Sequence, residues 1–170
     1  PVIGMFDRDT KIIITDDKLN SYDIRDKQYC RMAPNIYAFA IPIPHNRSEA
    51  DQISIEHYFT DKEIKTELEG KRLFFGNEFY PTGVYRGDEE FFYKSARNIS
   101  DTIKIIEHET KTYVTKSDAS GDYSLSKARF VESIEKCKPA FSNFSFDEFN
   151  KIFEVLSLII KDCSECTPKT

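Results

Sequence analysis

The sequence predicts an α/β fold: a short, mostly parallel sheet with flanking helices, and an inserted β-rich or irregular element at about residues 70–120. Three segments carry this prediction. Residues 2–6 (VIGMF) are apolar on both faces, which is typical of a central strand in a covered parallel sheet. Residues 36–44 (IYAFAIPIP) form a second apolar run that ends at prolines. The segment FSFDEFNKIFEVLSLIIKDC has the spacing of an amphipathic helix.

The remaining elements are shorter. We expect a short helix around residues 53–59, a second from Asp61 where TDKE offers an N-cap and an acidic first turn, and a strand at 71–75. Residues 102–109 and 111–118 predict two strands of a hairpin or small accessory sheet, and SKARFVESIEKCK predicts a helix from Ser126. The apolar stripe expected on the last helix comprises Phe149, Ile152, Phe153, Leu156, Ile159 and Ile160.

Length and composition limit the possible classes of protein. A chain of 170 residues suits a single domain over residues 1–170, and an opening directly inside a strand suggests the C-terminal fragment of a longer protein. The net charge of −5 gives no general attraction for nucleic acid, yet it leaves open an enzyme whose acidic site holds metal ions. No membrane span or signal peptide is visible, and the four irregularly spaced cysteines are interpreted as reduced thiols of a cytoplasmic protein.

Asp7 and Asp9 follow the first predicted strand. Residues i and i+2 of a strand point the same way, so both carboxylates should lie together at the carboxyl end of a central strand, where α/β sheets bind ligands. Adjacent carboxylates repel each other unless a cation lies between them, and Mg²⁺ prefers oxygen ligands. The alternative is an exposed turn with two ordinary aspartates.

Asp-x-Asp after a hydrophobic strand has two familiar uses. In haloacid-dehalogenase phosphatases a Thr or Val normally stands two residues after the second Asp, but Lys11 occupies that place here. A phosphatase with Asp7 as its nucleophile is therefore a weaker interpretation. The other use is in the TOPRIM fold of topoisomerases, primases and related nucleases, where two aspartates bind a divalent metal for phosphodiester chemistry.

Several segments occur in a recognisable order: VIGMFDRDT, NIYAFAIPIPHNR, ISIEHYF, GKRLFFGNEF, SKARFVESI and FSNFSFDEFNKIF. In this order the chain resembles the C-terminal part of the TOPRIM nuclease modules that follow ATPase domains in overcoming-lysogenization-defect-type phage-defence proteins. The resemblance implies a TOPRIM or Rossmann-like fold, an endonuclease that cleaves or nicks nucleic acid with Mg²⁺ or Mn²⁺, and an upstream ATPase domain in the same polypeptide. DNA is the expected substrate rather than RNA.

One departure from the family concerns an essential Glu on an earlier strand, because only Pro1 precedes Val2 here. We therefore expect the isolated chain to be weak or inactive. The competing interpretation is a non-catalytic TOPRIM-like interaction or dimerisation module, and a homodimer is left open for either function.

Two further residues receive roles from the resemblance. It implies that Glu56 joins Asp7 and Asp9 as a catalytic residue and metal ligand, completing a second ion site, with Glu49 and Asp51 as fallback ligands. The alternative for Glu56 is a solvent-facing helix residue. Lys127 would neutralise charge that develops on the scissile phosphate, although a surface lysine is the common alternative.

Other chemistry-bearing residues are interpreted as structural. His45 and His57 are expected to be hydrogen-bonded residues rather than ligands, and the single pair Cys163 and Cys166 is weak support for zinc. Aromatic and basic residues interleave through residues 71–94, a pattern that can bind nucleic acid, but we expect the core of a compact insertion.

Overall fold

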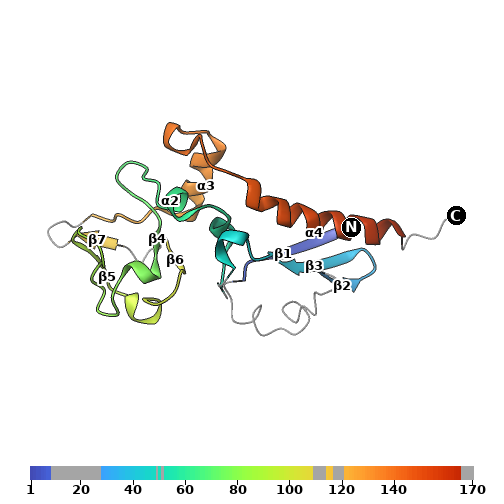
Figure 1. Ribbon diagram of the computed structural model, residues 1–170, viewed down its shortest axis with the longest axis horizontal. Helices are drawn as coiled ribbons and strands as arrows, with labels where there is room; N and C mark the ends of the chain where they lie inside the picture. The colour runs from blue at the N-terminus through green and yellow to red at the C-terminus, as the bar shows by residue number, and fades with distance from the viewer. Residues whose placement is uncertain (9–27, 49, 51, 109–113, 117–120, 166–170) are drawn as a thin grey trace. The chain divides into compact units, whose positions relative to one another are not determined.

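The computed structural model describes residues 1–8, 28–48, 50, 52–108, 114–116 and 121–165 (Figure 1). The chain forms two compact units, one of Pro1–Tyr58 with Phe146–Thr170 and one of Phe59–Ser145. The single domain expected over residues 1–170 stays a prediction. In the first unit, β1 (Val2–Phe6), β2 (Cys30–Ala33) and β3 (Ile36–Ala40) form a sheet of order β1-β3-β2.

This sheet contains both kinds of pairing. β1 runs parallel to β3, with Val2 opposite Ile36 and Phe6 opposite Ala40, whereas β2 runs antiparallel to β3. The reversal between β2 and β3 passes through Asn35, whose φ of 61° lies in the left-handed region that asparagine tolerates better than most residues.

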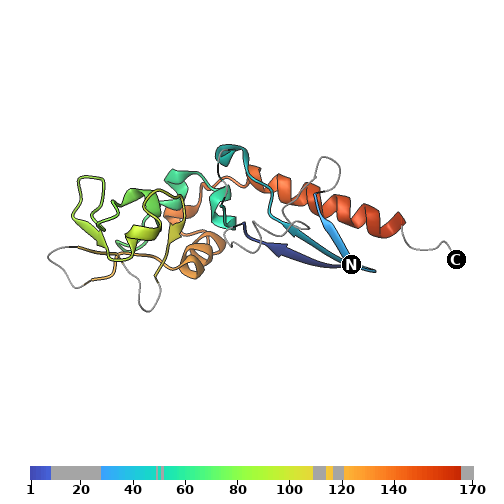
Figure 2. The ribbon, with the colours of Figure 1, turned by 90° about the horizontal axis from the view of Figure 1, so that it is seen from below.

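Helix α4 (Asn150–Glu165) runs along this sheet in both views (Figures 1 and 2). Ile152, Val155 and Ile159 are its buried residues, and their spacing of three and four places them on one face. The predicted helix is confirmed, but its predicted stripe is partly wrong because Phe153 and Ile160 remain 59% and 58% exposed.

The second unit is built from two small antiparallel sheets. β4 (Phe74–Phe75) pairs with β6 (Ile105–Ile106), and β5 (Phe91–Tyr93) pairs with β7 (Val114–Lys116). Of the two alternatives predicted for these segments, a hairpin formed by β6 and β7 is wrong, because each pairs with an earlier strand. The alternative of strands in small sheets agrees with the structure. Short 3-10 turns in the two units lie at His45–Arg47, Ile55–Tyr58, Gly76–Glu78, Ala96–Asn98, Pro139–Phe141 and Asp147–Phe149.

Two helices of this unit begin at residues whose side chains cap them, the first at the N-cap that TDKE predicts. α2 (Asp61–Ile64) has a capping box between Thr60 and Glu63, and α3 (Lys127–Glu135) has Ser126 as its N-cap. The side-chain oxygens of Thr60 and Ser126 accept from the third N–H of each helix, which has no partner within the helix itself.

Aromatic rings fill the core of the second unit. From the sequence, the aromatic residues of 71–94 are expected to form the core of this part of the chain. This is confirmed for those that pack in one cluster with Ala96, Ile106 and Val114. Tyr80 and Phe92 are the exceptions, at 49% and 39% exposed. The buried aromatic residues of this cluster are Phe74, Phe79, Phe91 and Tyr93.

The predicted mostly parallel sheet is wrong. Within the described ranges every sheet has two or three strands, and β1 with β3 is the parallel pair among otherwise antiparallel ladders. β1 is also an edge strand rather than a central one, with Val2, Met5 and Phe6 at 68%, 50% and 42% exposed. An apolar run shows that the side chains of a strand are hydrophobic, but it does not show whether the strand has a neighbouring strand on both sides. VIGMF therefore has the sequence of a central strand although it lies at the edge of its sheet.

Candidate functional site

The carboxyl end of β1 is tied to the segment around residue 54. Asp7 is half-buried, and its Oδ1 accepts a hydrogen bond of 2.9 Å from the backbone N–H of Ile55. The next residue, Arg8, donates its backbone N–H to Ile53 O at 2.8 Å and its Nε to Ile41 O at 2.7 Å. These bonds fix the position at which Asp7 leaves the sheet.

The segment that receives Asp7 carries a buried polar cluster. The hydroxyl of Ser54 donates to Glu56 Oε2 at 2.6 Å, and the backbone N–H of Ser54 donates to His57 Nδ1 at 2.9 Å. A neutral His57 that accepts at Nδ1 carries its proton on Nε2. All three side chains are nearly inaccessible, with exposed fractions of 2% for Ser54, 5% for Glu56 and 2% for His57.

The structure therefore brings Asp7 close to the turn that carries Glu56. The alternative of a solvent-facing Glu56 is wrong, because burial and the Ser54 hydroxyl hold this carboxylate inside the unit. Ser54 was not among the expected site residues. Its signal in the sequence is a hydroxyl residue between two isoleucines, two positions before an acid.

Three of the acidic candidates lie outside the described residues: Asp9, Glu49 and Asp51. Among the described residues, no group of three or more His, Cys, Asp or Glu side chains could hold a metal ion. Mg²⁺ commonly uses only one or two protein carboxylates and retains several waters. The oxygen donors of Asp7 and Glu56 match that ion in chemical type.

Lys127 belongs to the second unit, as the first residue of α3. Its backbone N–H donates to Glu107 Oε2 at 3.0 Å, which satisfies one of the helix's first amides. A contribution of its ammonium group to phosphate chemistry stays a prediction.

The histidine and cysteine expectations have separate outcomes. His45 contacts Glu148 Oε2 through its backbone N–H at 2.7 Å and its Nδ1 at 3.3 Å, so the expected hydrogen-bonded roles of His45 and His57 are confirmed. The Sγ atom of Cys163 lies 3.4 Å from the Oδ1 atom of Asn35. Cys166 lies outside the described residues, so the structure does not test a zinc site at this cysteine pair.

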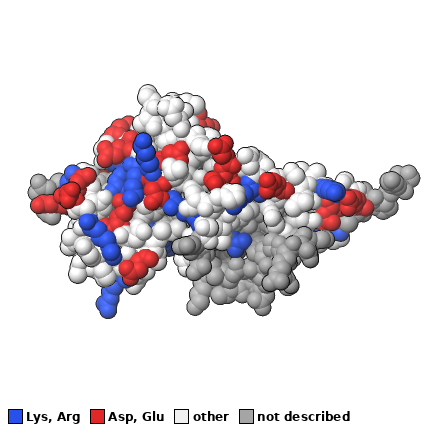
Figure 3. All heavy atoms as spheres, in the orientation of Figure 1, with Lys and Arg blue, Asp and Glu red and all other residues white. Residues whose placement is uncertain are grey.

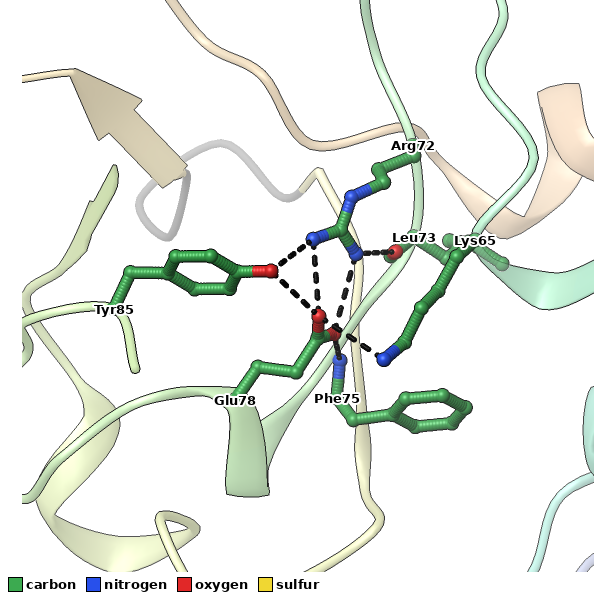
Figure 4. A network of polar contacts seen from close by, with 6 residues as sticks. All are labelled: Lys65, Arg72, Leu73, Phe75, Glu78 and Tyr85. Carbon is green, nitrogen blue, oxygen red and sulfur yellow. Dashed lines mark hydrogen bonds and ion pairs between the residues drawn. The ribbon is translucent and has the colours of Figure 1, made fainter. Parts of the chain in front are cut away.

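The second unit contains a buried network that the sequence did not predict (Figure 4). Arg72 donates to Glu78 Oε1 at 3.0 Å, to Glu78 Oε2 at 3.2 Å and to Leu73 O at 2.9 Å. The Phe75 N–H also donates to Glu78 Oε2, at 2.7 Å. The guanidinium carbon of Arg72 lies 3.7 Å from the centre of the Phe74 ring, a cation–π contact.

Two further side chains complete this network (Figure 4). The Tyr85 hydroxyl lies 3.0 Å from Arg72 Nη2, and Lys65 Nζ lies 3.3 Å from Glu78 Oε1. Burial raises the pKa of Tyr85, and the Glu78 carboxylate raises it further because it disfavours a phenolate. The network is thus a set of buried charges that satisfy one another, and no spacing in the sequence predicted it.

The displayed surface carries charges of both signs. On the face drawn in Figure 3, Lys and Arg side chains are interspersed with Asp and Glu rather than gathered into one continuous basic area.

No helix in the described ranges is both long enough and apolar enough to cross a membrane. Comparisons with models of protein families, with curated proteins and with solved structures find no match to this chain.

Proposed function

We propose that this chain is a metal-dependent endonuclease module that cleaves or nicks nucleic acid, DNA in preference to RNA, within an ATPase-associated defence protein. The observation that carries the proposal is the bond from Ile55 N–H to Asp7 Oδ1, which holds an acidic strand end against the turn bearing Glu56. The resemblance of the sequence to overcoming-lysogenization-defect-type nucleases supports the same reaction class.

Each residue has a distinct part in this proposal. Asp7 and Asp9 would hold Mg²⁺ or Mn²⁺ at the end of β1, and Glu56 would help to place a second ion. The Ser54 hydroxyl orients the Glu56 carboxylate, and the Ile55 N–H orients that of Asp7. When bound, the ion would stabilise the negative charge that develops on the phosphate.

A non-catalytic interaction module is the competing proposal. The edge position of β1 favours it, because a nuclease of the expected type would hold its two aspartates at the end of a central strand. The bonds of Asp7 and Glu56 to residues 54 and 55 also suit carboxylates whose role is to fix a turn.

Thermal unfolding with and without metal separates the two proposals. A ligand that binds only the folded state stabilises it by about 2.7 kcal/mol at a hundredfold excess over Kd. Millimolar Mn²⁺ or Mg²⁺ should therefore raise the Tm of the wild type, and should do so much less in Asp7→Asn or Asp9→Asn. Asp88→Asn, a substitution of an exposed aspartate in the second unit, is the matched control and should keep the full shift.

The same variants without metal give the second half of the test. Relief of repulsion between the carboxylates should leave Asp9→Asn as stable as the wild type or slightly more stable. Plasmid cleavage by the isolated chain should be weak or absent. If metal never shifts the Tm and Asp9→Asn is strongly destabilised, the aspartates are structural and the interaction module is the better proposal.

A further inference from the structure

The outer edge of β1 presents unused backbone groups. Val2 N–H donates to Asn35 O at 2.7 Å, and Phe6 O accepts from Ile41 N–H at 2.9 Å, so the backbone groups of both residues face β3. Because these directions alternate along a strand, Gly4 also faces β3, whereas the N–H and C=O groups of Ile3 and Met5 point away from it. In the part of the chain that the structure describes, no strand pairs with this outer edge.

β1 also lacks the features that protect edge strands. Such strands usually carry a charge, a proline or a bulge, but VIGMF contains neither a charge nor a proline and pairs with β3 in unbroken register. Its exposed side chains are apolar: Val2 at 68%, Met5 at 50% and Phe6 at 42%. An open edge of this kind favours pairing with another strand.

We propose that the strand pairing with this edge is β1 of a second copy of the chain, antiparallel to the first. In the proposed register Gly4 lies opposite Gly4 of the partner subunit, on a twofold axis. Ile3 then lies opposite Met5 of the partner subunit, and the pair exchanges backbone hydrogen bonds, as their outward N–H and C=O groups require. Because both subunits use the same edge in a twofold pairing, the edge is fully occupied in the dimer and no third copy can be added there.

The side chains of β1 suit this register. Val2 comes opposite Phe6 of the partner subunit, a pairing of β-branched with aromatic residues that stabilises antiparallel sheets. Gly4 occupies a position without cross-strand hydrogen bonds, where the two Cα atoms approach to about 4.5 Å. A charged residue within this strand would lie close to a charge on the second copy, but VIGMF contains none.

This inference names a partner for the interaction-module proposal and rests on that proposal for its biological role. Its test uses neither metal nor nucleic acid, so the dimer and the metal site can fail separately. The first measurement is the mass of the whole chain by sedimentation over a concentration series. The expected species has twice the 19.8 kDa of a single chain.

Met5→Pro is the disruptive variant. Proline removes an N–H that points away from β3, which an edge strand tolerates, and it blocks the bond to the second copy. The variant should become monomeric while its circular dichroism stays that of the wild type. Phe153→Lys, at an exposed apolar residue of α4, is the control and should remain dimeric.

Cysteine cross-linking tests the register and does not depend on how Met5→Pro folds. A Gly4→Cys chain should form an intermolecular disulfide rapidly, because a Cα separation of about 4.5 Å lies within disulfide range. The added Cβ would lie 3.0 Å from Phe6 Cε2, an atom at the far end of a side chain that can rotate. Val2→Cys should cross-link no faster than the unsubstituted chain, because the two equivalent positions lie about 14 Å apart along the strands.

A monomeric wild type at the highest concentration studied would overturn the proposal. So would a dimer that persists in a folded Met5→Pro chain. Cross-linking that is as fast through Val2→Cys as through Gly4→Cys would also overturn it, because the twofold would then not pass through Gly4. Monomeric Met5→Pro and selective Gly4→Cys cross-linking support it.

Discussion

Arg72 and Glu78 form a two-point ion pair inside the second unit, with nitrogen–oxygen distances of 3.0 and 3.2 Å. Each residue is 8% exposed, so the charges satisfy each other with little help from water. Such a pair contributes little net stability compared with apolar residues of similar shape, but the loss of one partner leaves a buried charge uncompensated.

Removing one partner of this pair should therefore be costly. Glu78→Leu, which leaves the buried Arg72 guanidinium without its carboxylate, should lower the free energy of unfolding by about 3–5 kcal/mol in urea titrations. Arg72→Met combined with Glu78→Leu should cost less than the sum of the two single changes. Arg129→Gln, which removes a pair with Glu69 between side chains 47% and 66% exposed, should cost less than about 1 kcal/mol. Strict additivity of the two buried changes would contradict a coupled pair.

Tyr85 should make the stability of the second unit depend on alkaline pH. Its pKa is raised in the folded chain above the ordinary value of 10.0, so the folded state holds the proton more tightly than the unfolded state. This contribution is complete below pH 10 and is lost as the pH rises through the folded pKa. Urea titrations from pH 8 upward should show a steeper loss in wild type than in Tyr85→Phe, and parallel curves would contradict the prediction.

Ser54→Ala should destabilise the first unit, because it leaves the buried Glu56 carboxylate without the hydroxyl that donates to it at 2.6 Å. The expected loss is about 1–3 kcal/mol in thermal or urea unfolding. Ser157→Ala is the control, because that exposed hydroxyl donates to the carbonyl of Phe153, one turn away in its own helix. Equal effects of the two substitutions would show that the Ser54 bond has no special weight.

Gly76 should not accept a side chain. A Cβ at this position would lie 2.1 Å from Ile99 O, a backbone atom that cannot rotate away. Gly76→Ala should therefore cost about 1–3 kcal/mol, as overpacking of a core commonly does. Gly121→Ala, whose Cβ would approach no atom closer than 3.4 Å, should have a much smaller effect on the urea midpoint. A neutral Gly76→Ala would mean that this loop shifts easily.

Local structure could be predicted from the sequence because its causes are local. The strand at residues 2–6 and the helix beginning at Asp61 with its predicted cap at Thr60 are confirmed. The helix predicted from Ser126 is confirmed as well, and the structure adds that Ser126 is its N-cap. The position of Asp7 directly after β1 follows from the same pattern. In each case the deciding contacts lie within a few residues of one another.

Pairing between distant segments could not be predicted in the same way. β4 pairs with β6 across about thirty residues, and nothing in FF or II specifies that partner over another apolar strand. The same limit applies to Glu56, since its burial depends on where residues 54–57 pack rather than on their own sequence. The edge position of β1 belongs to this class as well, because an apolar strand does not encode the number of its neighbours.

The discontinuous make-up of the first unit has a consequence for synthesis on the ribosome. Its strands are made first, but α4, which buries Ile152, Val155 and Ile159, is made last. Residues Phe59–Ser145 are contiguous, and within their unit Glu63 Oε1 accepts from Ser145 N–H at 2.7 Å, so its two ends meet without help from the other unit. The second unit can therefore fold during synthesis before α4 has been made, whereas the first unit can complete its fold only after α4 is made. This reverses the usual order, in which the N-terminal unit of a chain folds first.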